Sequence, residues 1–428
     1  MASKPRISIV GIGYVGLPLA VALARHYEVT ALDADPERIA QLQAGVDRTR
    51  EVDPATLRKC TVAFTADPGD IARADIFIIT VPTPVDGDSR PDLSALSAAC
   101  GTVGGVMGKG AIVVIESTVY PGVTEEICGP DLEAASGLGC GRDFFLGYSP
   151  ERINPGDPEH SVGRITKVVA GQTPKVAARL GDIYGAITSG GVFTAKDIRT
   201  AEAAKVIENA QRDLNIAFIN EVTMIFNRLG LSIHDVLEAA NSKWNFLDFK
   251  PGAVGGHCIG IDPFYLAHVA RTHGHNPEIV LAGRRINDDM GAYIAARIAD
   301  EIAAGGSSRG AEKVLVLGLA FKEDVPDLRN SKVIDIVRGL RSRGHGVDVH
   351  DPLADPAEAM ALYKIALRPT LDGAEGYGCV VGAVSHSSYR AFTAETLASL
   401  IEPNGLVADI KGMWRHLALP PNLRRWQL

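Results

Sequence analysis

The stretch GAVGGHCIGIDP, residues 252–263, places a thiol in a glycine-rich run with almost no bulk. Glycines lie on both sides of Cys258, and Asp262 follows it by four residues. Glycine permits positive φ and a close approach of the backbone to another group, at an entropic cost. Taken alone, the run is most simply a tight loop around a small buried cysteine. The rest of the chain must decide whether the thiol does chemistry.

The stretch 200–230 is predicted to be one long helix, because apolar residues recur at helical spacing and Gly230 suits a C-cap. Lys205, Asn209 and Arg212 are separated by four and three residues, so they share one face of this helix. Such a polar stripe is ordinarily solvated. Asparagine has a poor propensity for helix interiors, however, which indicates a further reason for Asn209.

The N-terminal region contains the motif Gly11-Ile12-Gly13-Tyr14-Val15-Gly16. An apolar strand precedes it, a helical pattern follows it, and a second strand ends in Asp33 about twenty residues later. In this context the first glycine makes the turn, the second lets the backbone approach a pyrophosphate, and the third packs the helix on the strand. The N-terminus of the helix offers N–H groups and its positive dipole end to the phosphates.

Asp33 distinguishes between the two nicotinamide dinucleotides. Its carboxylate can accept hydrogen bonds from both hydroxyls of the adenine ribose of NAD, but it would repel the 2′-phosphate of NADP. A basic residue in this region can favour NADP, but Arg38 is interpreted as covering the adenine or ribose edge, because Asp33 ends the strand itself. The motif therefore predicts an NAD site.

Polar side chains recur where further predicted strands end. Thr83 lies in DIFIITVPTP (75–84), Glu116-Ser117-Thr118 lie in AIVVIESTVYPG (111–122), and Glu151 and Arg152 lie in FFLGYSPERINPGD (144–157). Each of these residues alone is ordinarily a helix cap or a turn residue. Their recurrence indicates a site, because an open parallel sheet forms its ligand crevice at the carboxyl ends of its strands.

Composition limits the class of protein. The chain has 428 residues, so two or three domains are expected, and its net charge of −8 argues against a general nucleic-acid binder. The six cysteines are scattered, with no CxxC pair and no zinc spacing, which predicts reduced thiols, no metal site and a cytoplasmic setting. The uncharged stretch 7–24 is like a signal peptide or a short membrane span, but glycines and Pro18 interrupt it and a strand follows. No membrane attachment is expected.

The second half repeats the alternation of strands and helices. A helical stretch over 281–304 leads to Gly305-Gly306-Ser307-Ser308, a predicted boundary. There follow the strand KVLVLGLAF (313–321), the polar loop KEDVPDLRNS, a helix over 332–343 and the strands VDVHDP, CVVGAVS and GLVADI. The expected fold class is α/β, with two Rossmann-like, doubly wound parallel-sheet domains joined by a long-helix central segment.

Nearly the whole chain carries an ordered series of motifs: GIGYVGLPLA, VPTPVD, ESTVYPG, SPERINPGD, the helix with Lys205 and Asn209, GGHCIGIDPFYL and GLAFKEDVPDLRNS. Together they resemble the UDP-glucose/UDP-mannuronic acid (nucleotide-sugar 6-) dehydrogenase family. The resemblance implies an NAD-binding domain over residues 1–195, a helical dimerisation and active-site domain over 196–305, and a UDP-binding domain over 306–428. A homodimer or a higher homo-oligomer is expected.

The resemblance also implies a reaction. In this family a sugar 6-hydroxymethyl group is oxidised to a carboxylate in two hydride transfers, with two NAD⁺ and one thiol. A thiolate holds the aldehyde as a thiohemiacetal, whose second hydride loss gives a thioester that water cleaves. By this resemblance Cys258 is the nucleophile, and Asp262 activates water or the hydroxyl by proton relay.

Further residues take roles by matching position in the family. Lys205 and Asn209 would stabilise the oxyanion states. Glu151 would act in thioester hydrolysis, and Thr118 would order the water. NAD would be bound by Gly11, Gly13, Tyr14, Val15, Gly16, Asp33, Arg38, Thr83, Thr118 and Arg329. The sugar nucleotide would be bound by Glu151, Arg152, Lys205, Asn209, Arg212, Phe249, Gly252, Gly255, Gly256 and Lys322. The segment 249–256 would line the uridine–sugar channel, and the glycines around Cys258 would admit the sugar close to the backbone.

Departures from the UDP-glucose branch favour another substrate. That branch usually has phenylalanine-glycine-glycine-serine before the cysteine and a lysine before the aspartate, whereas this chain has His257 and Ile261 there. The form GGHCIGIDP is similar to the branch that acts on UDP-N-acetylhexosamines for polysaccharide biosynthesis. UDP-N-acetylglucosamine is the first choice, followed by UDP-N-acetylgalactosamine and UDP-N-acetylmannosamine, with UDP-glucose as the remaining alternative. His257 either tunes the thiolate or points away from it.

Two other classes of function are alternatives to this one. The first is a non-catalytic NAD or nucleotide-sugar sensor, which needs no thiol. The second is a one-step hydroxy-acid dehydrogenase or a UDP-sugar epimerase, which needs a His/Arg or Tyr/Lys arrangement and no nucleophilic cysteine. The presence of Cys258 together with Lys205, Asn209 and Asp262 argues against both. Counting the NADH released per sugar separates them: two for oxidation to the acid, one for a simple dehydrogenase and none for an epimerase or a sensor.

Overall fold

The computed structural model describes residues 4–153, 159–256, 259–305 and 312–428. The chain divides into two compact units: the first contains residues 1–208 and 264–276, and the second contains residues 209–263 and 277–428. The predicted nucleophile Cys258 and its neighbour His257 lie outside the described residues. The expected division into three domains at residues 195 and 305 stays a prediction.

The first unit contains a sheet whose eight described strands follow the order β3-β2-β1-β4-β5-β6-β7-β8. They are β1 (Arg6–Val10), β2 (Glu28–Leu32), β3 (Ala63–Thr65), β4 (Ile76–Ile79), β5 (Ile112–Ile115), β6 (Phe145–Tyr148), β7 (Lys167–Gly171) and β8 (Val192–Thr194). The order of the first six is that of dinucleotide-binding sheets, and it reverses between β1 and β4. Ligands of such sheets bind at this reversal, outside the carboxyl ends of the strands.

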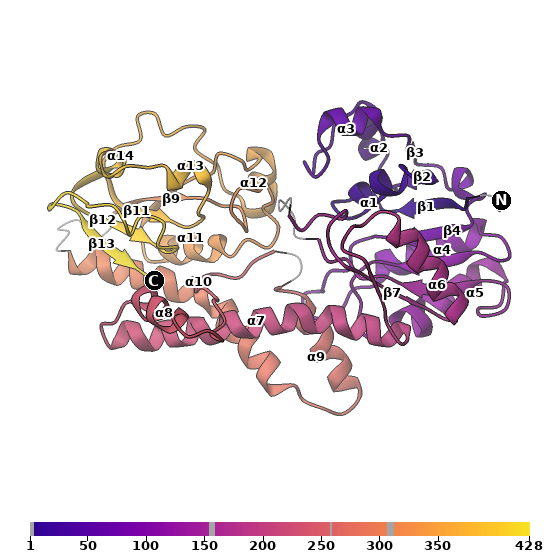
Figure 1. The fold of residues 1–428 in the computed structure, drawn as a ribbon. Coiled ribbons are helices and arrows are strands. Elements are labelled where there is room, and N and C mark those ends of the chain that lie inside the picture. Colours follow the sequence, from indigo (N-terminus) through magenta and orange to yellow (C-terminus); the bar gives the residue numbers. More distant parts are fainter. Residues whose placement is uncertain (1–3, 154–158, 257–258, 306–311) are drawn as a thin grey trace. The chain divides into compact units, whose positions relative to one another are not determined.

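Helices cover both faces of this sheet (Figure 1). They are α1 (Gly16–Leu23), α2 (Pro36–Gln43), α3 (Pro54–Lys59), α4 (Ser94–Val106), α5 (Gly129–Ser136), α6 (Pro174–Gly185) and the first part of α7 (Ile198–Arg228). Side chains of β1 alternate between the faces, as the pleat requires. Ile7 and Ile9 belong to the apolar cluster that contains α1 and α6, whereas Val10 belongs to the cluster that contains α4 and α5. The core therefore consists of two apolar layers with the sheet between them.

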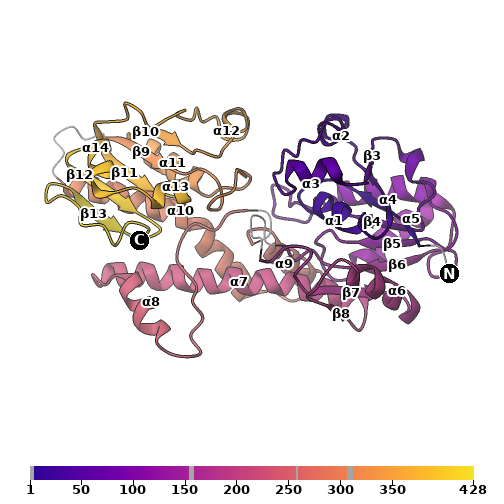
Figure 2. The same cartoon turned by 45° about the horizontal axis from the view of Figure 1, so that its top comes forward.

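The second unit contains a sheet in which the described strands follow the order β10-β9-β11-β12-β13 and every neighbouring pair is parallel (Figure 2). The strands are β9 (Lys313–Leu317), β10 (Gly346–His350), β11 (Tyr377–Gly382), β12 (Ile401–Asp409) and β13 (Arg424–Gln427). The helices are α8 (Ile233–Asn241), α10 (Glu278–Ala304), α11 (Val333–Ser342), α12 (Pro356–Tyr363), α13 (Ser387–Arg390) and α14 (Ala394–Leu400). Helices α10 and α11 pack on one face of the sheet and α14 on the other. The strand order reverses between β9 and β11, which predicts a ligand crevice beyond their carboxyl ends.

The expected fold class is confirmed, and the long helix predicted over 200–230 is α7. Two features depart from the sequence-based expectation. Strand β7 is antiparallel to β6, because the chain between them, as far as it is described, contains no helix to carry it back for a parallel pairing. Helix α9 (Asp262–Thr272), which was not predicted, begins directly after the glycine-rich run. Pro263 at its second residue favours a helix start, because the first turn needs no N–H from that position. No described helix is long and apolar enough to cross a membrane.

The two sheets begin with the same local structure. Gly11 follows β1 with φ of +93°, and Gly318 follows β9 with φ of +97°. The residue after each glycine donates its backbone N–H to a carboxylate at the end of the neighbouring strand, at 2.7 Å in both cases. These carboxylates are Asp33 after β2 and Asp351 after β10. They differ in exposure: Asp33 is half-buried, whereas Asp351 is buried and contacts His386.

Candidate active site

The three glycines after β1 each meet a different steric demand. Gly11 has positive φ, and a Cβ there would lie 2.9 Å from Val81. A Cβ at Gly13 would meet nothing within 4 Å, so this backbone stays open to an approaching group. A Cβ at Gly16 would lie 2.0 Å from the carbonyl oxygen of Gly11, so only glycine allows α1 to start here. These are the roles that a dinucleotide-binding turn requires of its glycines.

Backbone N–H groups hold the Asp33 carboxylate in place, and one of them belongs to the glycine turn after β1. Its Oδ2 accepts from Ile12 N at 2.7 Å and its Oδ1 accepts from Asp35 N at 3.0 Å. Arg38 is only 1% exposed, and its Nε donates to the Ile12 carbonyl at 2.9 Å. An ion pair at 2.9 Å holds its guanidinium against Asp47. Arg38 therefore supports the turn from within the protein, and its contact with adenine or ribose stays a prediction.

The loops after β4 and β5 are tied to each other and to the glycine turn. The Thr80 hydroxyl donates to the Gly11 carbonyl at 2.6 Å. The Thr83 hydroxyl donates to the Thr118 carbonyl at 2.7 Å, so two predicted cofactor contacts are neighbours. The Tyr265 hydroxyl, from α9, donates to the Thr83 carbonyl at 2.7 Å. These bonds fix the backbone of the first sheet at its carboxyl edge.

Glu151 and Arg152 leave β6 at the same edge. Glu151 is 8% exposed, and its Oε1 accepts from Ile153 N. Its Oε2 is buried and has no hydrogen-bond partner within the described parts of the chain. Arg152 pairs with Glu208 of α7 at 2.8 Å and donates to the Thr166 carbonyl at 3.0 Å. Glu151 thus has an oxygen available to a ligand or a water, whereas Arg152 is engaged by protein.

On α7, the predicted polar stripe is divided by burial. Lys205 is 6% exposed and Asn209 is 7% exposed, whereas Arg212 is exposed. The Asn209 side chain donates to the Asp262 carboxylate, across 53 positions of sequence. The second unit therefore brings together two residues that the sequence placed in separate motifs.

The glycines before Cys258 are closely packed against protein. Gly252 has φ of +148°, and a Cβ there would lie 2.9 Å from Lys411 Nζ. A Cβ at Gly255 would lie 2.6 Å from the Asn330 carbonyl oxygen, and one at Gly256 would lie 2.8 Å from the Phe321 ring. These contacts explain the glycines without a ligand. The expectation that 249–256 lines a substrate channel therefore stays a prediction, as does the role of Phe249, which packs beside the apolar cluster of α7 and α8.

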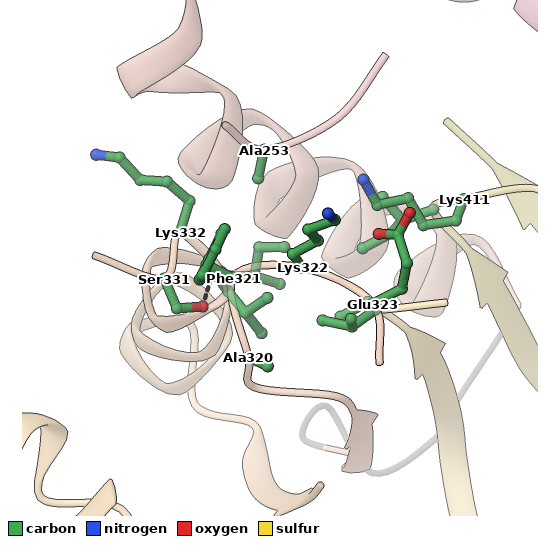
Figure 3. Close-up of a pocket in the computed structure, with 13 residues that line it drawn as sticks. Ala253, Ala320, Phe321, Lys322, Glu323, Ser331, Lys332 and Lys411 are labelled. Atoms are coloured by element: carbon green, nitrogen blue, oxygen red, sulfur yellow. Dashed lines mark hydrogen bonds between the residues drawn. The ribbon is translucent and has the colours of Figure 1, made fainter. Parts of the chain in front are cut away.

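A pocket lies where the strand order of the second sheet reverses (Figure 3). The lining residues follow β9, β11 and β12 or begin α11, and Ala253 joins them from the glycine run: Ala253, Ala320, Phe321, Lys322, Glu323, Ser331, Lys332, Val333, Ile336, Ala383, Val384, Ile410 and Lys411. Figure 3 shows Lys322 and Lys411 on the same side of the pocket, with Glu323 beside Lys411. Ammonium groups are suitable ligands for phosphate.

The charges of this pocket are partly compensated. Lys332 pairs with Asp288 at 3.0 Å. Part of the Lys411 side chain is exposed, but the protein packed around its ammonium lowers its pKa, and the Glu323 carboxylate opposes that shift. Arg329, on the loop that supplies Lys322, forms a two-pronged pair with Asp327 at 2.6 and 2.9 Å. Lys322 is thus placed in the pocket, and the predicted contact of Arg329 with NAD stays a prediction.

Sequence reasoning missed several residues of these two sites. Thr80 directly follows β4, and Lys411 is the second residue after β12. Both could have been predicted, because ligands bind at the carboxyl ends of the strands. Tyr265 gave no signal, because its partner Thr83 is 182 positions away in the sequence.

Family models match the chain in three successive parts. They are described as the UDP-glucose/GDP-mannose dehydrogenase family NAD binding domain over residues 5–188, central domain over 199–289 and UDP binding domain over 315–416. Protein CapL of Staphylococcus aureus is 48% identical over 422 residues, which cover 99% of each chain. A UDP-N-acetyl-D-glucosamine 6-dehydrogenase of Pseudomonas aeruginosa is 48% identical over 408 residues, 95% of this chain and 96% of that one. The solved structure of a UDP-D-ManNAc dehydrogenase from Pyrococcus horikoshii has a TM-score of 0.87 at 30% identity and covers 98% of both chains.

Proposed function

This chain belongs to the UDP-glucose/GDP-mannose dehydrogenase family, and we propose that it oxidises the 6-hydroxymethyl group of UDP-N-acetylglucosamine to a carboxylate. It is an NAD-dependent oxidoreductase of nucleotide sugars. The observation that carries the choice of sugar is the 48% identity to a relative named for UDP-N-acetyl-D-glucosamine, against 30% to a structure named for the mannosamine. The GGHCIGIDP form of the thiol loop supports an N-acetylated sugar independently.

The turn after β1 suits the cofactor. Gly13 leaves its backbone open for the pyrophosphate, and the Asp33 carboxylate accepts one backbone N–H on each oxygen, which leaves lone pairs for ribose hydroxyls. Bound NAD supplies the acceptor for each hydride that leaves the sugar carbon. The linked loops of Thr83 and Thr118 would hold the nicotinamide end.

The thiol of Cys258 would bind the aldehyde covalently between the two oxidations. After the first hydride leaves, the thiolate adds to the aldehyde carbon, and the oxygen takes up the charge and then a proton. Loss of the second hydride and of that proton gives a thioester. Water then adds, the C–S bond breaks, and the thiolate leaves with the carboxylate as product. In total, one alcohol, one water and two NAD⁺ give one carboxylate, two NADH and three protons.

The buried polar side chains near this chemistry would manage its charges and protons. Lys205 and Asn209 would stabilise the successive oxyanions. The hydrogen bond from Asn209 orients Asp262 for proton relay. The Glu151 carboxylate would accept the proton of the attacking water, and Thr118 would order that water.

The pocket of the second unit would bind the uridine diphosphate. Lys322 and Lys411 place ammonium groups at the reversal of strand order, where a doubly wound sheet binds nucleotides. The tight packing of Gly255 and Gly256 on Asn330 and Phe321 fixes the run that leads to Cys258 against the wall of this pocket. Binding of the nucleotide and placement of the thiol would thus share one structural element.

We further propose a homodimer located in the cytoplasm. Phe218 and Ile225 lie at helical spacing along α7, Leu229 directly follows the helix, and all three are exposed. Exposed apolar side chains that share a helix face indicate an interface. Cysteines 60, 100, 128, 140 and 379 are free thiols, which suits a reducing compartment. Sedimentation equilibrium of Phe218→Glu beside the native chain would test the interface.

A panel of UDP-sugars tests the proposed reaction. The purified chain is mixed with NAD and with UDP-N-acetylglucosamine, UDP-N-acetylgalactosamine, UDP-N-acetylmannosamine or UDP-glucose, and NADH release is followed. We expect two NADH per sugar and the highest kcat/KM for UDP-N-acetylglucosamine. Equal or better turnover of UDP-glucose would contradict the choice of sugar, and one NADH per sugar would contradict oxidation to the acid.

A further inference from the structure

A fully buried ion pair lies inside the first unit, and the proposed reaction does not use it. Glu116 directly follows β5, Lys167 begins β7, and both are 0% exposed. Lys167 Nζ donates to Glu116 Oε1. The Tyr184 hydroxyl, from α6, donates to Glu116 Oε2 at 2.8 Å, and Lys167 Nζ lies 5.1 Å from the centre of the Tyr184 ring. Three elements thus enclose one carboxylate.

The topology places this pair beside Glu151. Strands β5 and β6 are parallel, with Ile115 level with Tyr148, so Glu116 emerges beside the segment that carries Glu151. Because β7 is antiparallel to β6, its first residue, Lys167, lies at the edge where β5 and β6 end. The departure from a parallel sheet therefore brings a lysine to the active-site edge.

Stability alone does not account for such a pair. Taking two charges out of water is costly, and apolar residues of similar volume often serve as well or better. The charge of Glu151 also acts on Glu116. Burial raises the pKa of Glu116, the Lys167 ammonium opposes that shift, and the negative charge of Glu151 adds to it. Two neighbouring carboxylates repel each other, and a cation beside them offsets this repulsion so that both can stay ionised.

The other charged and titratable groups around Glu151 are accounted for by their partners. The Arg152 guanidinium is engaged by Glu208 and by the Thr166 carbonyl. Lys205 lies one turn before Glu208 on α7 and belongs to the oxyanion site proposed above. The Tyr184 hydroxyl donates to Glu116; burial raises the pKa of Tyr184, and the negative charges of Glu116 and Glu151 add to that shift.

We propose that the Glu116–Lys167 pair is a positioning pair that keeps the charge beneath Glu151 near zero and so keeps Glu151 ionised for hydrolysis of the thioester. This rests on the proposed function of Glu151. Water forms the new C–O bond as the C–S bond breaks, and its proton needs an ionised carboxylate to receive it. Glu116 alone would hold a proton on Glu151, whereas Lys167 alone would draw the Glu151 carboxylate into a salt bridge. When both residues are present, Glu151 neither holds a proton nor is drawn into a salt bridge.

Three variants of the full chain test this charge balance: Lys167→Met, Glu116→Gln and the double variant. The readout is the pH at which Glu151 binds a proton, followed by infrared spectroscopy with ¹³C-labelled glutamate, and Glu151→Gln identifies its band. We expect Lys167→Met to move this pH up by about 1 unit and Glu116→Gln to move it down by a similar amount. The double variant should return it to the native value, because no net charge is left beneath Glu151.

The control is a second buried ion pair of similar exposure, Asp213 with Arg284 in the second unit, at 2.5 Å. Asp213→Asn should destabilise the protein and leave the protonation of Glu151 unchanged. Shifts of the same sign in both single variants, or no shift, would overturn the proposal. Should one single variant fail to fold, the sign of the shift in the other still decides. A shift of Glu151 in the double variant would also overturn the proposal, because the polar groups themselves, and not their charge balance, would then act on Glu151. The infrared readout needs no turnover, so a failure of the proposed reaction is seen separately, as missing NADH in the native protein.

Discussion

Replacing Asp33 by asparagine isolates the charge that distinguishes NAD from NADP. The asparagine oxygen can still accept from Ile12 N, which in the native chain lies 2.7 Å from the carboxylate. Its amide group, however, cannot accept from Asp35 N, so one of the two backbone bonds is lost. Alanine would remove both bonds and would confuse cofactor affinity with damage to the turn.

The expected magnitude follows from the hydrogen bonds to the ribose. Losing a charged acceptor costs about 1–3 kcal/mol, which raises the Kd of NAD about 5- to 150-fold. The Kd of NADP should rise less or fall, because the carboxylate no longer repels its 2′-phosphate. Isothermal titration with each dinucleotide measures the two constants, and thermal unfolding checks the fold.

Asp351→Asn is the matched control, because Asp351 accepts from Leu319 N at the same place in the second sheet. It should lower stability and leave the Kd of NAD unchanged. An unchanged ratio of the two dinucleotide affinities in Asp33→Asn would refute the role assigned to Asp33. An equal loss of NAD affinity in Asp351→Asn would show that general destabilisation explains the effect.

Three further predictions concern the thiol, the glycine run and acid stability. Cys258→Ala should lose acid formation by several orders of magnitude while calorimetry still detects NAD and UDP-sugar; near-native release of two NADH per sugar would disprove the covalent role. Gly256→Ala should lower the free energy of unfolding in urea by at least about 1–2 kcal/mol, because φ of +88° disfavours a side chain and its Cβ would meet the Phe321 ring at 2.8 Å. Gly260→Ala is the control: its Cβ would meet no atom nearer than 3.7 Å, so it should lower the free energy of unfolding by less. Equal losses in the two variants would contradict the steric argument. Hydrogen bonds from His386 and two backbone N–H groups outweigh burial and lower the pKa of Asp351 to about 2, so the ionised Asp351 carboxylate stabilises the fold above its usual pKa and this stabilisation is lost as the pH falls toward 2. The free energy of unfolding of Asp351→Asn should therefore depend less on pH between pH 4 and 2 than that of the native protein. An equal dependence on pH in the two proteins would contradict this prediction.

The sequence alone determined the features that depend on neighbours along the chain. The glycine motif, the strand before it and the aspartate after it lie within one short segment, so their types and spacing already implied the turn with Gly11 at positive φ. Helix α7 was predictable in the same way, since its apolar period is a property of consecutive residues. The ordered motifs carried the family, and with it the cofactor.

Tertiary structure decided what depends on contacts between distant segments. Glu116 and Lys167 are 51 positions apart, and only the antiparallel direction of β7 brings them together. The sequence predicted that the glycines around Cys258 admit the sugar close to the backbone, but Gly255 and Gly256 are packed against Asn330 and Phe321. Periodicity and local propensity describe one segment at a time. Burial and charge pairing depend on which segments the fold makes neighbours, and no single segment contains that information.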